Sequence, residues 1–147
     1  MTTSKSKPTD NRWHTHIIDE IVRKLSFLRS CNQIDVHKGT VHGSDVSITR
    51  DGRCINIEVV QDPSGNGWPG TIGRWSARHD LATFVVFTQP FHERVLETLD
   101  EHPDKHPHYE FFKRPNVFLM SDVQLPELAA LIGSLVMCQL KPEFVGR

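Results

Sequence analysis

A tight turn between two alternating runs constrains the fold of this chain more than any other feature of its sequence. The turn spans Arg50 to Arg53, and its central Asp-Gly is a preferred pair for a two-residue type I′ hairpin turn. On either side, residues 45–49 and 54–60 alternate polar and apolar positions, as a half-buried strand does. The sequence therefore predicts a β-hairpin with its turn at residues 51 and 52.

The turn also fixes the register of the hairpin. If residues 51 and 52 form the loop, Ile48 pairs with Ile55, and the same register sets Asp45 directly opposite Glu58. Because side chains alternate along a strand, the two carboxylates share one face of the hairpin. A slip of one residue would put them on opposite faces. The predicted polar face holds Asp45, Ser47, Asn56 and Glu58, and the predicted core face holds Val46, Ile48, Ile55 and Ile57.

Two directly opposed carboxylates repel each other unless a proton or a cation lies between them. Mg²⁺ prefers oxygen ligands and is commonly held by one or two carboxylates, together with waters and substrate phosphate. The pair of Asp45 and Glu58 is therefore a candidate site for Mg²⁺ or Mn²⁺. The alternative is that Asp45 caps a strand edge and Glu58 is solvated, with no metal.

The remaining segments alternate between helical and strand patterns. Apolar residues recur at helical spacing from Asp10, a candidate N-cap, to Leu28, and further helices are expected over 71–79, over 91–99 and from Pro126 onward. Strands are expected over 34–38, over 83–88, which is apolar enough for the sheet centre, and over 117–120. The order α-β-β-β-α-β-α-β-α predicts a mixed β-sheet with helices on both faces, hence an α/β fold.

Length and composition limit the other possibilities. A chain of 147 residues suits one domain, expected over 11–140 between a disordered tail at 1–10 and a second tail at 141–147. The formal net charge of -1 gives no broad attraction to nucleic acid, so DNA binding would need a local basic face. No signal peptide or membrane-spanning run is apparent, which predicts a cytoplasmic protein without membrane contact.

The helix, the hairpin with Gly-Ser-Asp45 on its first strand and Ile-Glu58-Val-Val60 on its second, and the following helix and strand resemble the PD-(D/E)xK nuclease superfamily. The segments FVVFTQPFHERVLETL and NVFLMSDVQLPELAALI are similar to Mrr-type restriction endonuclease domains, in which a strand ending in Thr leads into a helix and a later strand leads into a Leu-rich helix. The resemblance covers residues 12–137. It implies a restriction-endonuclease-like fold and metal-dependent cleavage of DNA.

The resemblance assigns roles to individual residues. Asp45 would be the motif aspartate, Glu58 the second metal ligand, and Glu20 an accessory acid for which Asp19 competes. Val60 occupies the position of the motif lysine, so the cation that supports catalysis would have to come from elsewhere. The candidates for this cation are Lys38, Arg74 and Arg78.

A Gly- and Pro-rich segment, residues 62–70, follows the strand that carries Glu58. Trp68, Arg74 and Arg78 could therefore contact a nucleic-acid backbone or stack on a base near the carboxylates. The alternative is that the tryptophans of this region, Trp68 and Trp75, pack against the fold.

Three functions remain open. The first is a Mg²⁺-dependent endonuclease-like protein that hydrolyses phosphodiester bonds in DNA. The second, favoured by Val60, is a catalytically inactive domain of the same fold that binds nucleic acid or a protein partner. The third is an assembly or regulatory subunit in which the apolar C-terminal helix packs against a partner. Nucleases of the resembled class often act as symmetric dimers, so a homodimer is expected as an alternative to a protein partner.

Overall fold

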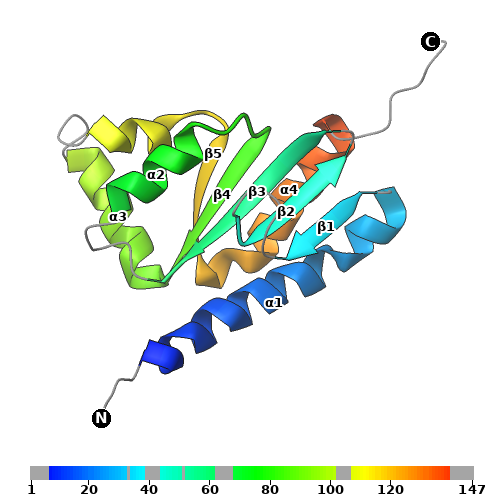
Figure 1. Ribbon diagram of the computed structural model, residues 1–147, viewed down its shortest axis with the longest axis horizontal. Coiled ribbons are helices and arrows are strands. Elements are labelled where there is room, and N and C mark those ends of the chain that lie inside the picture. Colours follow the sequence, from blue (N-terminus) through cyan, green and yellow to red (C-terminus); the bar gives the residue numbers. More distant parts are fainter. Residues whose placement is uncertain are drawn as a thin grey trace.

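The computed structural model describes residues 7–32, 34–38, 44–50, 52–61, 68–101 and 107–139. Its elements follow the predicted alternation of helices and strands, with two short 3-10 helices in addition (Figure 1). In chain order they are α1 (Lys7–Asn32), β1 (Asp35–Lys38), β2 (Val46–Arg50), β3 (Arg53–Val60), α2 (Trp68–Ser76), β4 (Ala82–Phe87), α3 (Gln89–Glu101), η2 (Pro107–Lys113), β5 (Val117–Ser121), η3 (Asp122–Gln124) and α4 (Leu125–Gln139).

The five strands form one mixed sheet in the order β1-β2-β3-β4-β5. The first three strands are antiparallel neighbours, and β3, β4 and β5 run parallel to one another. The parallel pairs are joined through α2 and through α3 with η2, because parallel neighbours need a long crossover connection. The mixed α/β architecture is therefore confirmed. Strand β4 lies inside the sheet, between β3 and β5, and its residues are all buried, but the central strand of the five is β3.

The hairpin register is the one that its turn predicts. Arg50 pairs with Arg53, Ile48 with Ile55, and Val46 with Ile57. Gly52 has a φ of 82°, a conformation that suits glycine at a hairpin turn. Asp51 lies outside the described residues.

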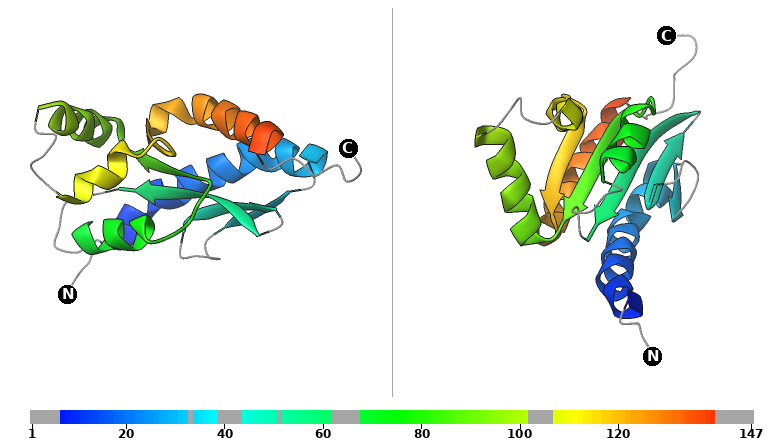
Figure 2. Two further views of the ribbon diagram at one scale, coloured as in Figure 1. Left: turned by 90° about the horizontal axis from the view of Figure 1, so that it is seen from above. Right: turned by 60° about the vertical axis from the view of Figure 1, so that its left-hand side comes forward.

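Two apolar clusters hold helices to the two faces of the sheet. One joins α1 and α4 to the apolar face of the hairpin, and the other joins α2, α3 and η2 to β4 and β5. Figure 2 shows α4 on one side of the sheet and α2 on the other. Five apolar hairpin residues belong to the first cluster: Val46, Ile48, Ile55 and Ile57, each with 0% of its surface exposed, and Val59 with 4%.

Several boundaries differ from the prediction by a few residues. Helix α1 begins at Lys7, so Asp10 lies inside the helix and is not its N-cap. The expected N-terminal tail at 1–10 is therefore wrong for residues 7–10, while residues 1–6 and the expected tail at 141–147 lie outside the described residues. None of the helices in the described ranges combines the length and the apolar character needed to span a membrane.

Candidate metal and phosphate site

Asp45 lies immediately before β2, where the chain enters the hairpin. Its Oδ2 accepts a hydrogen bond of 2.7 Å from the backbone N–H of Val59 in β3. Its Oδ1 lies 3.3 Å from Nε2 of His14 in α1. The carboxylate therefore adds one hydrogen bond between the two segments beyond Val46–Ile57, the last pair of the β2–β3 ladder. This is the strand-capping role that the sequence offered as the alternative to metal binding.

Glu58 lies on β3 and is 4% exposed. Its Oε2 accepts a hydrogen bond of 2.8 Å from Nη1 of Arg78, which follows α2. A solvated Glu58 is therefore wrong, because this carboxylate is buried and paired. Burial raises the pKa of Glu58 from 4.5 to about 7, with Asp45 and Asp80 adding to the rise while Arg78 opposes it.

Arg78 bridges two buried carboxylates. Besides the bond to Glu58, its Nε donates to Oδ2 of Asp80 at 3.1 Å. Its third nitrogen, Nη2, is buried without a hydrogen-bond partner, and it is the one such side-chain atom in the described part of the chain. A buried donor of this kind is costly to leave unpaired, so its two N–H groups are suited to a water or an anionic ligand oxygen.

A buried polar network continues from Asp80 across three strands. Asp80 accepts from Nδ2 of Asn56 at 2.8 Å and from Oγ1 of Thr83 at 2.7 Å. Because a carboxylate only accepts, the Asn56 amide must present its NH₂ group to Asp80 and its oxygen to the other side. On that other side, Oδ1 of Asn56 lies 2.8 Å from Oγ of Ser44 and 2.7 Å from Oγ of Ser47. Asn56 is therefore the centre of this network.

The charges in this region do not balance. Asp45, Glu58 and Asp80 contribute three carboxylates, whereas Arg78 is one guanidinium and His14 adds a positive charge only when protonated. A surplus of negative charge at low exposure favours uptake of a proton or a cation. Among the described residues, no group of three or more His, Cys, Asp or Glu side chains could hold a metal ion. Mg²⁺ is commonly held by one or two carboxylates together with waters.

The other predicted site residues lie apart from this cluster. Lys38 pairs with Val46 in the β1–β2 ladder, and its Nζ donates to Oδ1 of Asp19 in α1 at 2.7 Å. Glu20 forms an ion pair with Arg23 on the same helix, and this hydrogen bond lowers the pKa of Glu20. Both residues thus interact with α1, away from the face that carries Glu58.

Of the residues predicted to contact nucleic acid, one arginine is exposed and the other is buried. Arg74 is exposed on α2 and donates to Oγ1 of Thr71 at 3.2 Å, so it is free to meet solvent. Arg78 is instead held inside by Glu58 and Asp80. Trp75 is 6% exposed and packs near Phe111, as the alternative for the tryptophans expected. The side chain of Trp68 lies outside the described residues.

Sequence reasoning missed Asp80 and His14 as parts of the site, and it placed Asn56 on the polar face without giving it a role. The sequence gives a sign of the role of Asp80, because an acidic residue stands just before the buried run of β4. It gives none for His14, since its approach to Asp45 depends on how α1 crosses the sheet.

Comparison with known proteins adds no relative: no protein-family model, no characterised protein and no solved structure matches this chain.

Proposed function

We propose that this chain is a nuclease-type domain of the PD-(D/E)xK kind that hydrolyses phosphodiester bonds in DNA, with Mg²⁺ or Mn²⁺ bound by Asp45 and Glu58. The observation that carries the proposal is that Glu58 is buried on β3, 2.8 Å from Nη1 of Arg78, while Asp45 bonds to the next residue, Val59, and is close enough to raise the pKa of Glu58. The element order behind the family resemblance, a helix, a hairpin, a helix and a parallel strand, is also the order of this fold.

The donor set suits a hard divalent cation. Both ligands are carboxylates, and the negative surplus that includes Asp80 would offset the cost of desolvating the ion. The bound ion would activate a water molecule and stabilise the charge that develops on the phosphate. The backbone N–H of Val59 fixes the Asp45 carboxylate, leaving less conformational freedom to lose when a ligand arrives.

Arg78 would take over part of the role of the absent motif lysine. A guanidinium stays protonated, so it can hold Glu58 in its ionised form and donate hydrogen bonds, but it cannot accept a proton from water. Its buried Nη2 has two N–H groups without a partner in the described structure, and a phosphate oxygen is a suitable acceptor for them. Arg78 is therefore assigned to charge stabilisation and not to general-base catalysis.

A plasmid-nicking assay with Mg²⁺ or Mn²⁺ tests this assignment. Asp45→Asn and Glu58→Gln keep the shapes of the side chains but remove the charges that hold the ion, so each should lower the nicking rate by at least about a hundredfold. Arg78→Lys should lower it by a smaller factor. Glu97→Gln changes an exposed carboxylate on α3 and is the matched control. Nicking that persists in both Asp45→Asn and Glu58→Gln would refute the proposed site.

A catalytically inactive domain that binds DNA or a protein is the second candidate. Two observations favour it: Val60 stands at the lysine position, and Arg78 already occupies one oxygen of Glu58. Calorimetric titration with Mn²⁺ separates the two candidates without relying on activity. Heat of binding that disappears in Glu58→Gln supports the metal site, whereas the absence of heat in the wild type leaves the inactive domain.

A further inference from the structure

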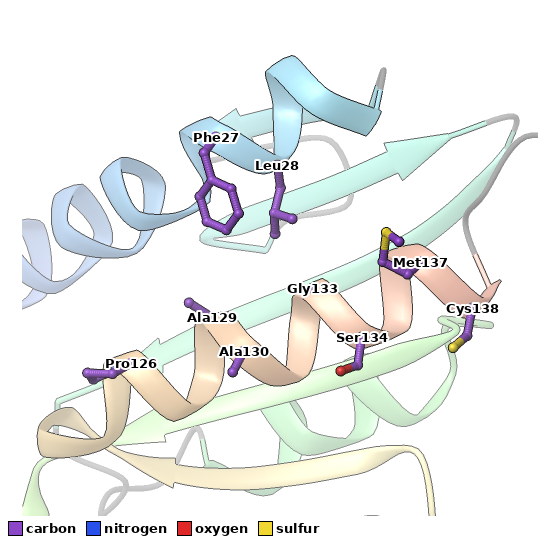
Figure 3. A pocket seen from close by; sticks show the side chains of 9 residues that line it. All are labelled: Phe27, Leu28, Pro126, Ala129, Ala130, Gly133, Ser134, Met137 and Cys138. Carbon is purple, nitrogen blue, oxygen red and sulfur yellow. The ribbon is translucent and has the colours of Figure 1, made fainter.

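A groove between α1 and α4 lies on the side of the sheet opposite α2 (Figure 3). Its volume is about 870 Å³, and it opens to solvent. The floor along α4 is made of small side chains, and larger apolar side chains stand at its borders. The lining residues include Phe27 and Leu28 of α1 and Ala129, Ala130, Gly133 and Met137 of α4.

Helix α4 is unusually apolar for a helix that meets solvent. Its inner side is buried through Leu128, Ile132 and Val136. Its outer side nevertheless exposes Leu131 at 39% and Met137 at 60%. Glu127 is the single charged residue in the fifteen of this helix. A surface helix normally carries charged residues on its outer side, and a helix that is apolar all round is normally buried.

The exposed apolar residues gather on this layer. Among the described side chains, five large hydrophobic residues are exposed, and three of them, Phe27, Leu131 and Met137, belong to α1 and α4. Phe27 is 58% exposed at the border of the groove. The same surface thus presents a projecting aromatic side chain and a hollow with a floor of small residues (Figure 3).

We propose that this surface is the interface of a symmetric homodimer, in which Phe27 of each copy inserts into the groove of the other. A twofold interface uses the same patch on both copies, so the patch must contain both a projection and a matching hollow. The α1–α4 surface meets this requirement. Aromatic residues seated in pockets are also the usual anchors of protein interfaces.

The charges on the two helices agree with pairing between copies. Around Phe27, α1 carries Lys24 and Arg29, together with Arg23, which already pairs with Glu20, whereas the one charge of α4 is the acidic Glu127. A twofold arrangement that lays α1 of one copy along α4 of the other brings basic residues toward Glu127. Such complementarity orients the two copies and raises the association rate more than it raises affinity.

The available area predicts a weak dimer. Fifteen helical residues span about 22 Å, and two neighbouring helices are about 20 Å wide, which gives on the order of 500 Å² for each copy. The total of roughly 1,000 Å² is at the lower limit of specific interfaces. We therefore expect a dissociation constant in the micromolar range. This inference does not depend on the proposed metal site.

Sedimentation equilibrium of the full chain, from about 5 to about 500 µM, tests the proposal. The average mass of the wild type should rise from the chain mass of 16.8 kDa toward twice that value. Phe27→Glu should weaken dimerisation at least roughly tenfold, because it places a charge in an apolar pocket. Ala130→Glu, an exposed position in the groove, should do the same.

Leu96→Glu is the matched control, since Leu96 is 44% exposed on α3 and takes no part in the groove. It should leave the dissociation constant within about twofold of the wild-type value. Circular dichroism of each variant checks that the fold is kept. A wild type that stays at the mass of one chain up to the highest concentration overturns the proposal and points to another segment or another protein as the cover. Equal weakening by Phe27→Glu and Leu96→Glu also overturns it.

Discussion

Both faces of the hairpin are largely buried, but they are chemically opposite. On one face Ile48, Ile55 and Ile57 have no exposed surface and belong to the apolar cluster that joins α1 and α4 to the sheet. On the other, Asn56 has no exposed surface and Glu58 only 4%, yet both are polar. Burial alone therefore does not decide the composition of a sheet face. The two faces differ in whether the neighbouring elements offer hydrogen-bond partners to the buried side chains.

Each face is stabilised by different physics. The apolar face gains free energy from the area it removes from water, in proportion to that area and without directional demands. The polar face must match each donor with an acceptor, because a buried polar group without a partner costs about 1–3 kcal/mol. Asp80 matches the NH₂ group of Asn56 and Arg78 matches Glu58, while Ser44 and Ser47 donate to the oxygen of Asn56. A buried polar network needs a partner for every donor and acceptor and adds little net stability. Such a network is more typical of a functional site than of a core.

The largest expected effect comes from removing the carboxylate that the polar face shares. Asp80→Ala leaves Arg78, Asn56 and Thr83 without their common acceptor, so we expect a loss of about 3–5 kcal/mol in the free energy of unfolding. Urea denaturation measures this loss. A change below about 1 kcal/mol would mean that water replaces Asp80 easily and that the polar face is far less demanding than its burial indicates.

The pH dependence of stability tests the charge on the same face. The folded-state pKa of Glu58 is raised from 4.5 to about 7, so the folded protein holds this proton more tightly than the unfolded chain does. The resulting stabilisation is fully present below pH 4.5 and is lost as the pH rises through 7. The shift corresponds to roughly 3 kcal/mol across this window.

Glu58→Gln cannot titrate and should lack this part of the pH dependence. Urea denaturation of both proteins at several pH values between 4 and 8 measures the difference in slope. Mn²⁺ should reduce the slope of the wild type if it binds the ionised form of Glu58. Parallel stability curves for the two proteins would show that Glu58 does not titrate in this range.

On the apolar face a conservative truncation should cost less. Ile57→Val removes one methylene from a fully buried side chain, and we expect a loss of about 1 kcal/mol at every pH. The measurement is the same denaturation series. A loss that changed with pH would indicate that packing on the apolar face influences the titration of Glu58 through β3, so that the two faces are not independent.

The division of the hairpin into faces could be read from the sequence, but the burial of its polar face could not. Alternation and the Asp-Gly turn fix which side chains point the same way, and the observed pairing of Ile48 with Ile55 follows from them. A polar face that meets water and a polar face that is covered by polar partners give the same alternating pattern, so the pattern cannot distinguish them. The Ser44 and Ser47 partners of Asn56 belong to the hairpin itself, but Asp80 lies 24 residues from Asn56 and Arg78 lies 20 residues from Glu58, and no local pattern links these pairs.

The elements themselves were predictable for a related reason. Strand and helix periodicity are local properties, so the order of helices and strands was predicted even though several boundaries differ by a few residues. The 3-10 helix η3 is only three residues long and has no periodicity to detect. The arginine that reaches Glu58 was one of three cations named from sequence, and only the packing of α2 on the sheet distinguishes Arg78 from Arg74.

The smallest expected effect comes from an ion pair of the same chemistry on the surface. Lys38 and Asp19 lie 2.7 Å apart, as close as Arg78 and Glu58, but their side chains are 58% and 53% exposed. Water already satisfies both charges when the pair is broken, so Lys38→Ala should change the free energy of unfolding by less than about 0.5 kcal/mol. Salt should reduce even this difference. Denaturation of Lys38→Ala and wild type at low and high ionic strength is the measurement. A loss in the free energy of unfolding near that of Asp80→Ala would contradict this expectation. It would show that the contribution of an ion pair depends on the distance between the charges and not on their burial.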